Sequence, residues 1–200
     1  MPYNKKTIKN GQTLDIASGG VFSIAGTTVT ASADELNLSD GQTATAAEVN
    51  RVCDKSASVV SATDNLTVTE ALHGDRLVVL NKAAGATMTL PAATGTGNRY
   101  TFIVGTTLTS NSYIVKVANA TDVMEGIAIG ADDDVEGAGT AHTWNCETND
   151  DTITMDGAAT GGKLGDKVEV IDYASGHFHV NCLLTQSGGS EATPFSATVS

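Results

Sequence analysis

Short apolar runs recur about every ten residues between positions 60 and 186, and glycine-containing turn sequences separate them. Strict alternation of apolar and polar residues marks several runs, such as 66–69 and 167–172. This cadence predicts a mainly β chain whose principal domain is an antiparallel β-sandwich or jelly-roll-like structure. The expected strands cover residues 66–72, 76–80, 86–90, 99–104, 113–117, 123–129, 152–155, 167–173 and 178–185.

Two features of these runs refine the expectation. Residues 76–80 are apolar on both faces of a strand, which is typical of a central strand covered on both sides. Gly95-Thr96-Gly97 is expected to form a hairpin turn.

The remaining chain divides into three parts in this interpretation. Residues 1–27 are predicted to form a docking arm, residues 28–59 a short helical linker, and residues 60–200 the β domain with a polar tail from 187 onward. The arm carries scattered apolar residues that need a partner surface, since strands this short do not form a sheet alone. These residues are Ile8, Leu14, Ile16, Val21, Phe22 and Ile24.

An internal repeat with a period of 13 residues occupies the linker, as TASADELN at 30–37 and TATAAEVN at 43–50. Each copy contains an S/T-x-x-E capping box, Ser32 with Glu35 and Thr45 with Glu48, which predicts the start of a helix. Helices of two or three turns are marginal alone, so Leu36 and Val49 are expected to dock on another surface.

The repeat resembles the TATAAELNxLDG units found in bacteriophage tail fibres, head fibres and other virion proteins. The segments TLPAATGTG at 89–97, YTFIVGT at 100–106, VANATDVM at 117–124 and EATPFS at 191–196 resemble the same class. The second repeat departs from the pattern, because Arg51 replaces an apolar residue and Cys53-Asp54-Lys55 replaces the usual ending. The resemblance implies a homotrimeric, non-catalytic module on the phage head or tail, located on the virion after assembly in the host cytoplasm.

Composition excludes some functions and disfavours others. The net charge of −12 argues against a nucleic-acid partner, because the only basic cluster is Lys5, Lys6 and Lys9. The chain has no apolar stretch near the ~20 residues of a spanning helix, so no membrane partner is expected. Three cysteines at irregular spacing indicate free, partly buried thiols.

No cofactor or bound metal is expected, although two weak metal candidates stand out. His177 and His179 would share one face of a strand, with Cys182 or His142 as a third ligand. The acidic run at 131–137, with Asp132 and Asp134, offers oxygens to Ca²⁺ but lacks the spacing of a calcium loop, and a second, weaker cluster comprises 149–151 with Asp156. A solvated acidic loop and ordinary polar strand residues explain these groups more simply.

Catalytic motifs are missing from the sequence. It contains neither a G-x-S-x-G elbow nor an H-E-x-x-H helix, and one Trp with four Tyr offers little surface for stacking sugars in a depolymerase. Carboxylates are plentiful, so the sequence does not exclude a pair of the kind that glycosidases use. The resemblance to virion proteins implies that the chain is a trimeric capsid decoration (cement) or head-fibre protein that binds the major capsid protein or another virion protein and stabilises the shell. The alternative is a tail-associated fibre or adhesin, with a host surface glycan as partner.

Overall fold

The computed structural model describes residues 21, 23–38, 40, 43–53, 58–133 and 139–199. The chain divides into two compact units, Met1–Ala46 and Ala47–Ser200. Of the predicted docking residues, Ile8, Leu14, Ile16 and Phe22 lie outside the described residues, as does the calcium candidate Asp134.

The first unit contains a two-stranded hairpin, β1 (Ser23–Ile24) with β2 (Thr27–Thr28), and the helix α1 (Ala33–Leu38). The predicted capping box is confirmed at α1. The Glu35 carboxylate accepts hydrogen bonds from the Ser32 N–H at 2.7 Å and hydroxyl at 2.8 Å, and the Glu35 N–H donates to Ser32 Oγ at 3.3 Å. The backbone bond from Ser32 is the largest cause of the lowered pKa of Glu35.

The second unit begins with the helix α2 (Ala46–Cys53), which starts directly after Thr45 as the second repeat copy predicts. The rest of this unit is a β domain, so the predicted mainly β class is confirmed. Its strands are β3 (Val59–Ala62), β4 (Leu66–Thr67), β5 (Arg76–Leu80), β6 (Ala86–Thr89), β7 (Arg99–Val104), β8 (Tyr113–Lys116), β9 (Val123–Asp132), β10 (Ala141–Asn145), β11 (Thr152–Met155), β12 (Lys167–Ala174), β13 (His177–Gln186) and β14 (Phe195–Ser196).

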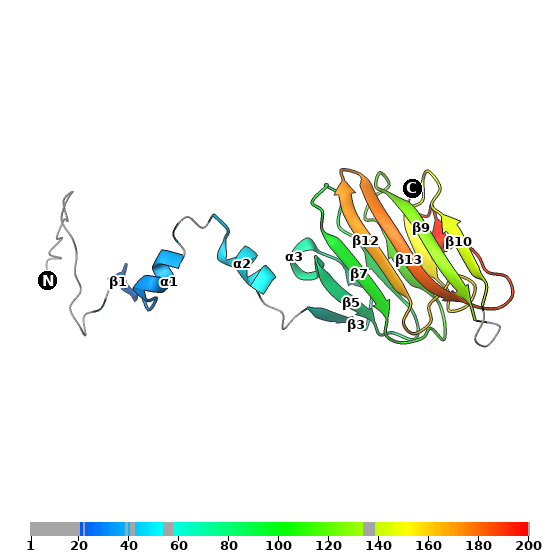
Figure 1. Ribbon diagram of the computed structural model, residues 1–200, viewed down its shortest axis with the longest axis horizontal. Helices are drawn as coiled ribbons and strands as arrows, with labels where there is room; N and C mark the ends of the chain where they lie inside the picture. The colour runs from blue at the N-terminus through cyan, green and yellow to red at the C-terminus, as the bar shows by residue number, and fades with distance from the viewer. Residues whose placement is uncertain are drawn as a thin grey trace. The chain divides into compact units, whose positions relative to one another are not determined.

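These strands form two sheets with a shared core. The larger sheet has the order β10-β9-β13-β12-β7-β5-β3, and the smaller has the order β14-β11-β8-β6-β4. Figure 1 shows the larger sheet from its front, with strands of the smaller sheet behind it. Inward-facing side chains such as Tyr100, Phe102, Tyr113 and Phe178 fill the space between them.

The prediction of an antiparallel domain is wrong for much of this fold. From β3 to β8 the chain alternates between the sheets, so β3, β5 and β7 pair in parallel in one sheet, as do β4, β6 and β8 in the other. β9 and β13 also pair in parallel. Each turn in the first half therefore crosses from one sheet to the other, and Gly95-Thr96-Gly97 connects two sheets instead of closing a hairpin.

Two further elements differ from the expectation. Residues 66–72 form the short strand β4 followed by the helix α3 (Glu70–His73), because His73 Nδ1 accepts the Thr69 N–H at 2.9 Å and stabilises a turn there. The predicted polar tail is instead part of the domain. Phe195 is buried in the core, and β14 pairs with β11.

Buried carboxylates hold the loops and the tail. Asp172, on β12, accepts the N–H groups of Thr94, Gly95 and Thr96 at 2.7–3.2 Å and the Thr96 hydroxyl at 2.8 Å. Asp151 accepts the N–H groups of Thr198 and Val199 at 2.9–3.2 Å. Buried backbone donors must find acceptors, and these side chains supply them where no strand does.

Asp166 and Asp122 act in the same way. Asp166 accepts the N–H groups of Gly162, Lys163 and Thr185 at 2.8–3.1 Å, and Asp122 accepts the Ala93 N–H at 2.8 Å. The weak second calcium cluster therefore has another role, since Asp151 caps the tail and Asp156 accepts N–H groups within its own loop.

We predict that Asp172→Asn lowers the free energy of unfolding by about 2–3 kcal/mol near neutral pH, because an amide offers one acceptor oxygen where the carboxylate offers two. Burial alone would raise the pKa of Asp172, but the hydrogen bonds from Gly95, Thr96 and Thr94 outweigh it and lower that pKa. The stabilisation is therefore fully present above about pH 4 and is lost as the pH falls through the lowered folded-state pKa.

Urea unfolding followed by circular dichroism between pH 2 and pH 7 measures this effect. The difference between wild type and Asp172→Asn should shrink toward the acid end. A difference that is constant across the pH range would contradict the proposed role of the carboxylate charge. Asp75→Asn is the matched control, because it makes the same change at an exposed carboxylate.

Candidate interaction face

The outer face of the seven-stranded sheet, turned away from the core, carries an unusual number of apolar side chains. Strand register aligns these side chains in rows across the sheet. The first row is Ser61–Val79–Ile103–Lys167–Leu183–Ile129–Thr143. The second row is Val59–Leu77–Thr101–Glu169–Asn181–Ile127–Asn145.

Each row has apolar residues on both sides of one charged residue, Lys167 in the first and Glu169 in the second. Glu169 lies 3.4 Å from Lys167 and 3.9 Å from Arg99, so one carboxylate lies between two cations. At these exposed positions the ion pairs contribute little stability, and their main effect is to cancel charge locally.

The apolar side chains on this face form two patches. The β5–β7 patch consists of Val59, Leu77, Val79 and Ile103. The β9–β13 patch consists of Ile127, Ile129, Leu183 and the neighbouring Leu164. Leu164 is 68% exposed and Leu183 50%.

A shallow hollow of about 320 Å³ lies within the β9–β13 patch, between Ile129, Ala131, Leu164 and Leu183. Exposed single apolar residues are ordinary, but contiguous patches on a soluble chain mark binding surfaces.

The histidine pair lies at one end of the same face. His177 Nδ1 is 3.1 Å from Glu125 Oε1, and the Tyr173 hydroxyl donates to the other Glu125 oxygen. The Tyr173 and His177 rings are 6.1 Å apart between centroids. Hydrogen bonding from Tyr173 is the largest cause of the lowered pKa of Glu125, with smaller contributions from His177 and His179.

Sequence reasoning found His177 and His179 but missed Glu125 and Tyr173. They come from β9 and β12, which flank β13 only in the folded sheet, so no sequence spacing could have revealed them. Both predicted third ligands are wrong. Cys182 points to the opposite face and is fully buried, and His142 lies on the core side beside Trp144, 3.8 Å from Glu191.

Within the described ranges, no three His, Cys, Asp or Glu side chains are grouped closely enough to hold a metal ion. Asp132, the described member of the first acidic run, belongs to β9. The described part of this chain thus offers no candidate metal centre at either predicted place.

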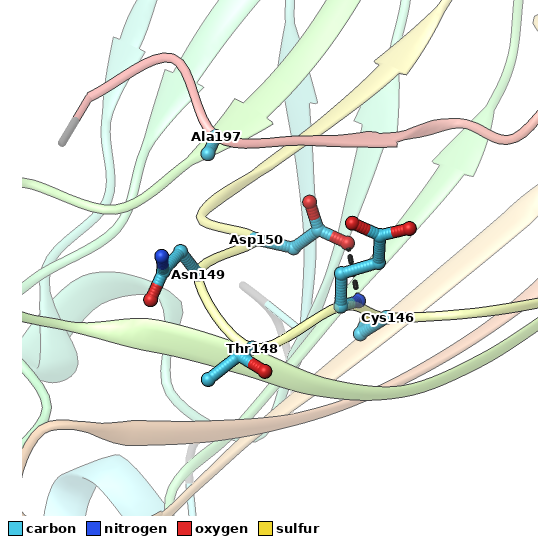
Figure 2. Close-up of a pocket in the computed structure, with 6 residues that line it drawn as sticks. Cys146, Thr148, Asn149, Asp150 and Ala197 are labelled. Atoms are coloured by element: carbon cyan, nitrogen blue, oxygen red, sulfur yellow. Dashed lines mark hydrogen bonds between the residues drawn. The ribbon is translucent and has the colours of Figure 1, made fainter.

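A polar hollow lies where the chain leaves β10, the edge strand of the larger sheet, and next to the end of β14, the edge strand of the smaller sheet. Figure 2 shows Cys146, Thr148, Asn149, Asp150 and Ala197 around a space of about 550 Å³. The dashed line in Figure 2 is the hydrogen bond from the Glu147 N–H to Asp150 Oδ2 at 2.7 Å.

An adjoining hollow of about 520 Å³ shares Glu147, Asp150 and Ala197 and adds Trp144, Phe195 and other residues. The Trp144 indole N–H donates to Gln186 Oε1 at 3.2 Å, so the ring is fixed at the wall of this hollow.

The three cysteines are free thiols, as predicted. Burial and the neighbouring Asp150 carboxylate raise the pKa of Cys146 to about 12, and burial also raises the pKa of Cys182. Thiols with raised pKa values are poor nucleophiles, so neither of these two residues suits catalysis.

Among the described residues, no helix has the length and apolar character needed to cross a membrane. Comparison of the chain with protein-family models, with curated proteins and with solved structures found no match.

We predict that Tyr173→Phe raises the pKa of Glu125 toward its ordinary value, because the variant removes the hydroxyl that stabilises the carboxylate. Carbon-detected NMR titration of the Glu125 carboxyl measures this change, with Glu169 in the same spectra as an internal control. The fold should be unaffected, since Tyr173 is exposed. An unchanged titration of Glu125 would show that the Tyr173 hydrogen bond is not maintained in solution.

Proposed function

We propose that this protein is a non-enzymatic structural component of a bacteriophage particle. It is a trimeric capsid decoration (cement) or head-fibre protein that docks on the outer shell through its first unit. The sequence support is the resemblance of the repeat at 30–54 to units of virion proteins.

The observation that carries the proposal is the exposure of the apolar side chains that the structure describes in the first unit. Among its described side chains none is buried, and Val29 is half-buried. Val21, Ile24 and Leu36 are 65%, 62% and 52% exposed, although they belong to or flank regular structure. A hairpin whose strands have two residues each and a helix of six residues are marginal in water. A partner surface that covers these residues would therefore stabilise them.

The second unit supports a structural role in a different way. It has an extensive core, and buried carboxylates fix its loops and its tail, which suits a rigid module. A protein that binds only the assembled shell stabilises that shell by mass action, without catalysis.

We predict that the full chain with Ile24→Asp and Leu36→Asp loses binding to phage heads by at least about 100-fold, because burying two carboxylates at an apolar contact is strongly unfavourable. Cosedimentation with heads stripped of the protein measures the affinity. Thr30→Asp with Thr43→Asp is the matched control, since it adds the same charge at exposed polar positions of the same unit. Equal binding by both variants would refute docking through this unit.

The hollow beside Trp144 favours a second candidate, a tail-associated adhesin that binds a host glycan. An aromatic ring next to carboxylate, amide and hydroxyl groups is a common arrangement for binding sugars, and here Glu147 and Asp150 lie in the wall. This candidate places the protein at the tail and makes glycan binding its main activity.

Trp144 is the only tryptophan of the chain, so its fluorescence reports on this hollow alone. For a head decoration protein we predict no saturable change in emission when a solubilised cell-wall polysaccharide of the host is added. A saturable change that Glu147→Gln abolishes would favour the adhesin. Glu70→Gln is the matched control, since Glu70 is exposed on α3, which contacts β5 on the other side of the larger sheet from β10.

A further inference from the structure

We propose that the outer face of the seven-stranded sheet is the contact between copies of this chain, with the β9–β13 patch at its centre. The inference rests on the proposed function only in that both require a protein that works as an assembly. It assigns self-association to the β domain and leaves docking on the shell to the first unit.

The exposed apolar side chains of this face would be more stable in contact with another protein surface than in water. Leu183 and Leu164 are half or more exposed, and the β5–β7 patch adds four more apolar side chains on the same surface. The patches are separated only by strand β12, so one approaching surface can cover both. Neighbouring strands lie about 4.8 Å apart, which places the patches on the order of 10 Å from each other.

The size of the face suits a stable protein contact. Seven strands about 4.8 Å apart, each about five residues long at about 3.3 Å per residue, give a flat area on the order of 550 Å². Protruding side chains raise the accessible area above this projection. A standard specific interface buries about 800 Å² on each partner, so a contact of this size needs the whole face, and one patch alone is too small.

Charge identifies a second copy as the occupant. The chain carries a net charge of −12, so two copies repel each other over most of their surfaces. On the strands of the outer face the charged side chains are Lys167, Arg99, Glu169 and Glu125, two of each sign, so their charges cancel. This is a face on which like-charged copies can approach without a large electrostatic cost.

The same two residues make the face self-complementary. Lys167 and Glu169 lie two positions apart on β12 and point outward together. A second copy in the reversed direction can place its Glu169 near Lys167 and its Lys167 near Glu169, a two-fold arrangement that joins copies in pairs and leaves the contacts of a trimer to other surfaces.

The test is sedimentation velocity of the full chain at micromolar concentration. The wild type is expected to sediment as an assembly of 20.4 kDa chains. Leu183→Lys should raise the dissociation constant at least about 100-fold and shift the protein toward a single chain, because a charge is placed in the apolar centre of the contact. Leu72→Lys is the matched control, since Leu72 is 60% exposed on α3, away from this face, and should leave the assembly intact.

A charge exchange adds a second, independent readout. Lys167→Glu leaves two like charges beside each other on each copy and should weaken the assembly, whereas Lys167→Glu with Glu169→Lys restores the balance and should recover it. A simple packing defect would not be rescued in this way. Amide NMR spectra of each variant establish that the single chain keeps its fold.

Three results would overturn the inference: a wild type that sediments as one chain, an assembly that Leu183→Lys leaves unchanged, or equal dissociation by Leu72→Lys. A stable dimer that Leu183→Lys dissociates would uphold this contact but contradict the trimer of the proposed function. Conversely, loss of head binding by the Ile24 and Leu36 variant concerns the first unit and leaves this contact untouched.

Discussion

The β domain depends on carboxylates that accept backbone N–H groups where no neighbouring strand does. A chain that alternates between two sheets must pass from one sheet to the other at every connection. In the connection from β6 to β7, the hydrogen bonds of the Thr94, Gly95 and Thr96 N–H groups are partly buried. Asp172 accepts three consecutive N–H groups of the connection between β6 and β7. Asp151 accepts N–H groups of the tail, and Asp166 accepts N–H groups of the loop before β12. The excess of acidic residues thus has an internal role besides its effect on the surface.

Much of the secondary structure could be predicted from the sequence, because alternation and capping are local signals. The strands at 76–80, 99–104 and 152–155 have the predicted bounds, and α1 begins at its predicted capping box. Pairing could not be predicted, since a strand that alternates in and out has the same local pattern whether its partner is parallel or antiparallel. The strand β14 could not be predicted, because the tail sequence is mostly polar and Phe195 is its one large side chain buried in the core.

The outer face of the larger sheet could not be predicted from the sequence alone. Leu77 and Val79 made residues 76–80 look like a strand covered on both sides, whereas β5 is the second strand from the edge of its sheet, between β7 and β3. In a single chain, however, these two side chains are only half-buried on the outer face. The sequence pattern and the exposed face agree if a second copy covers that surface. The partners of His177 could not be found, because Glu125 and Tyr173 reach it only through the order of the strands.

The three thiols differ in exposure, so one of them can be labelled selectively. Cys182 is enclosed by the core and Cys146 is half-buried beside a carboxylate, whereas Cys53 is exposed at the end of α2. A maleimide reagent at neutral pH should therefore modify the helical repeat and spare the β domain. A gold cluster coupled there would mark the repeat in electron micrographs without any change to the amino-acid sequence.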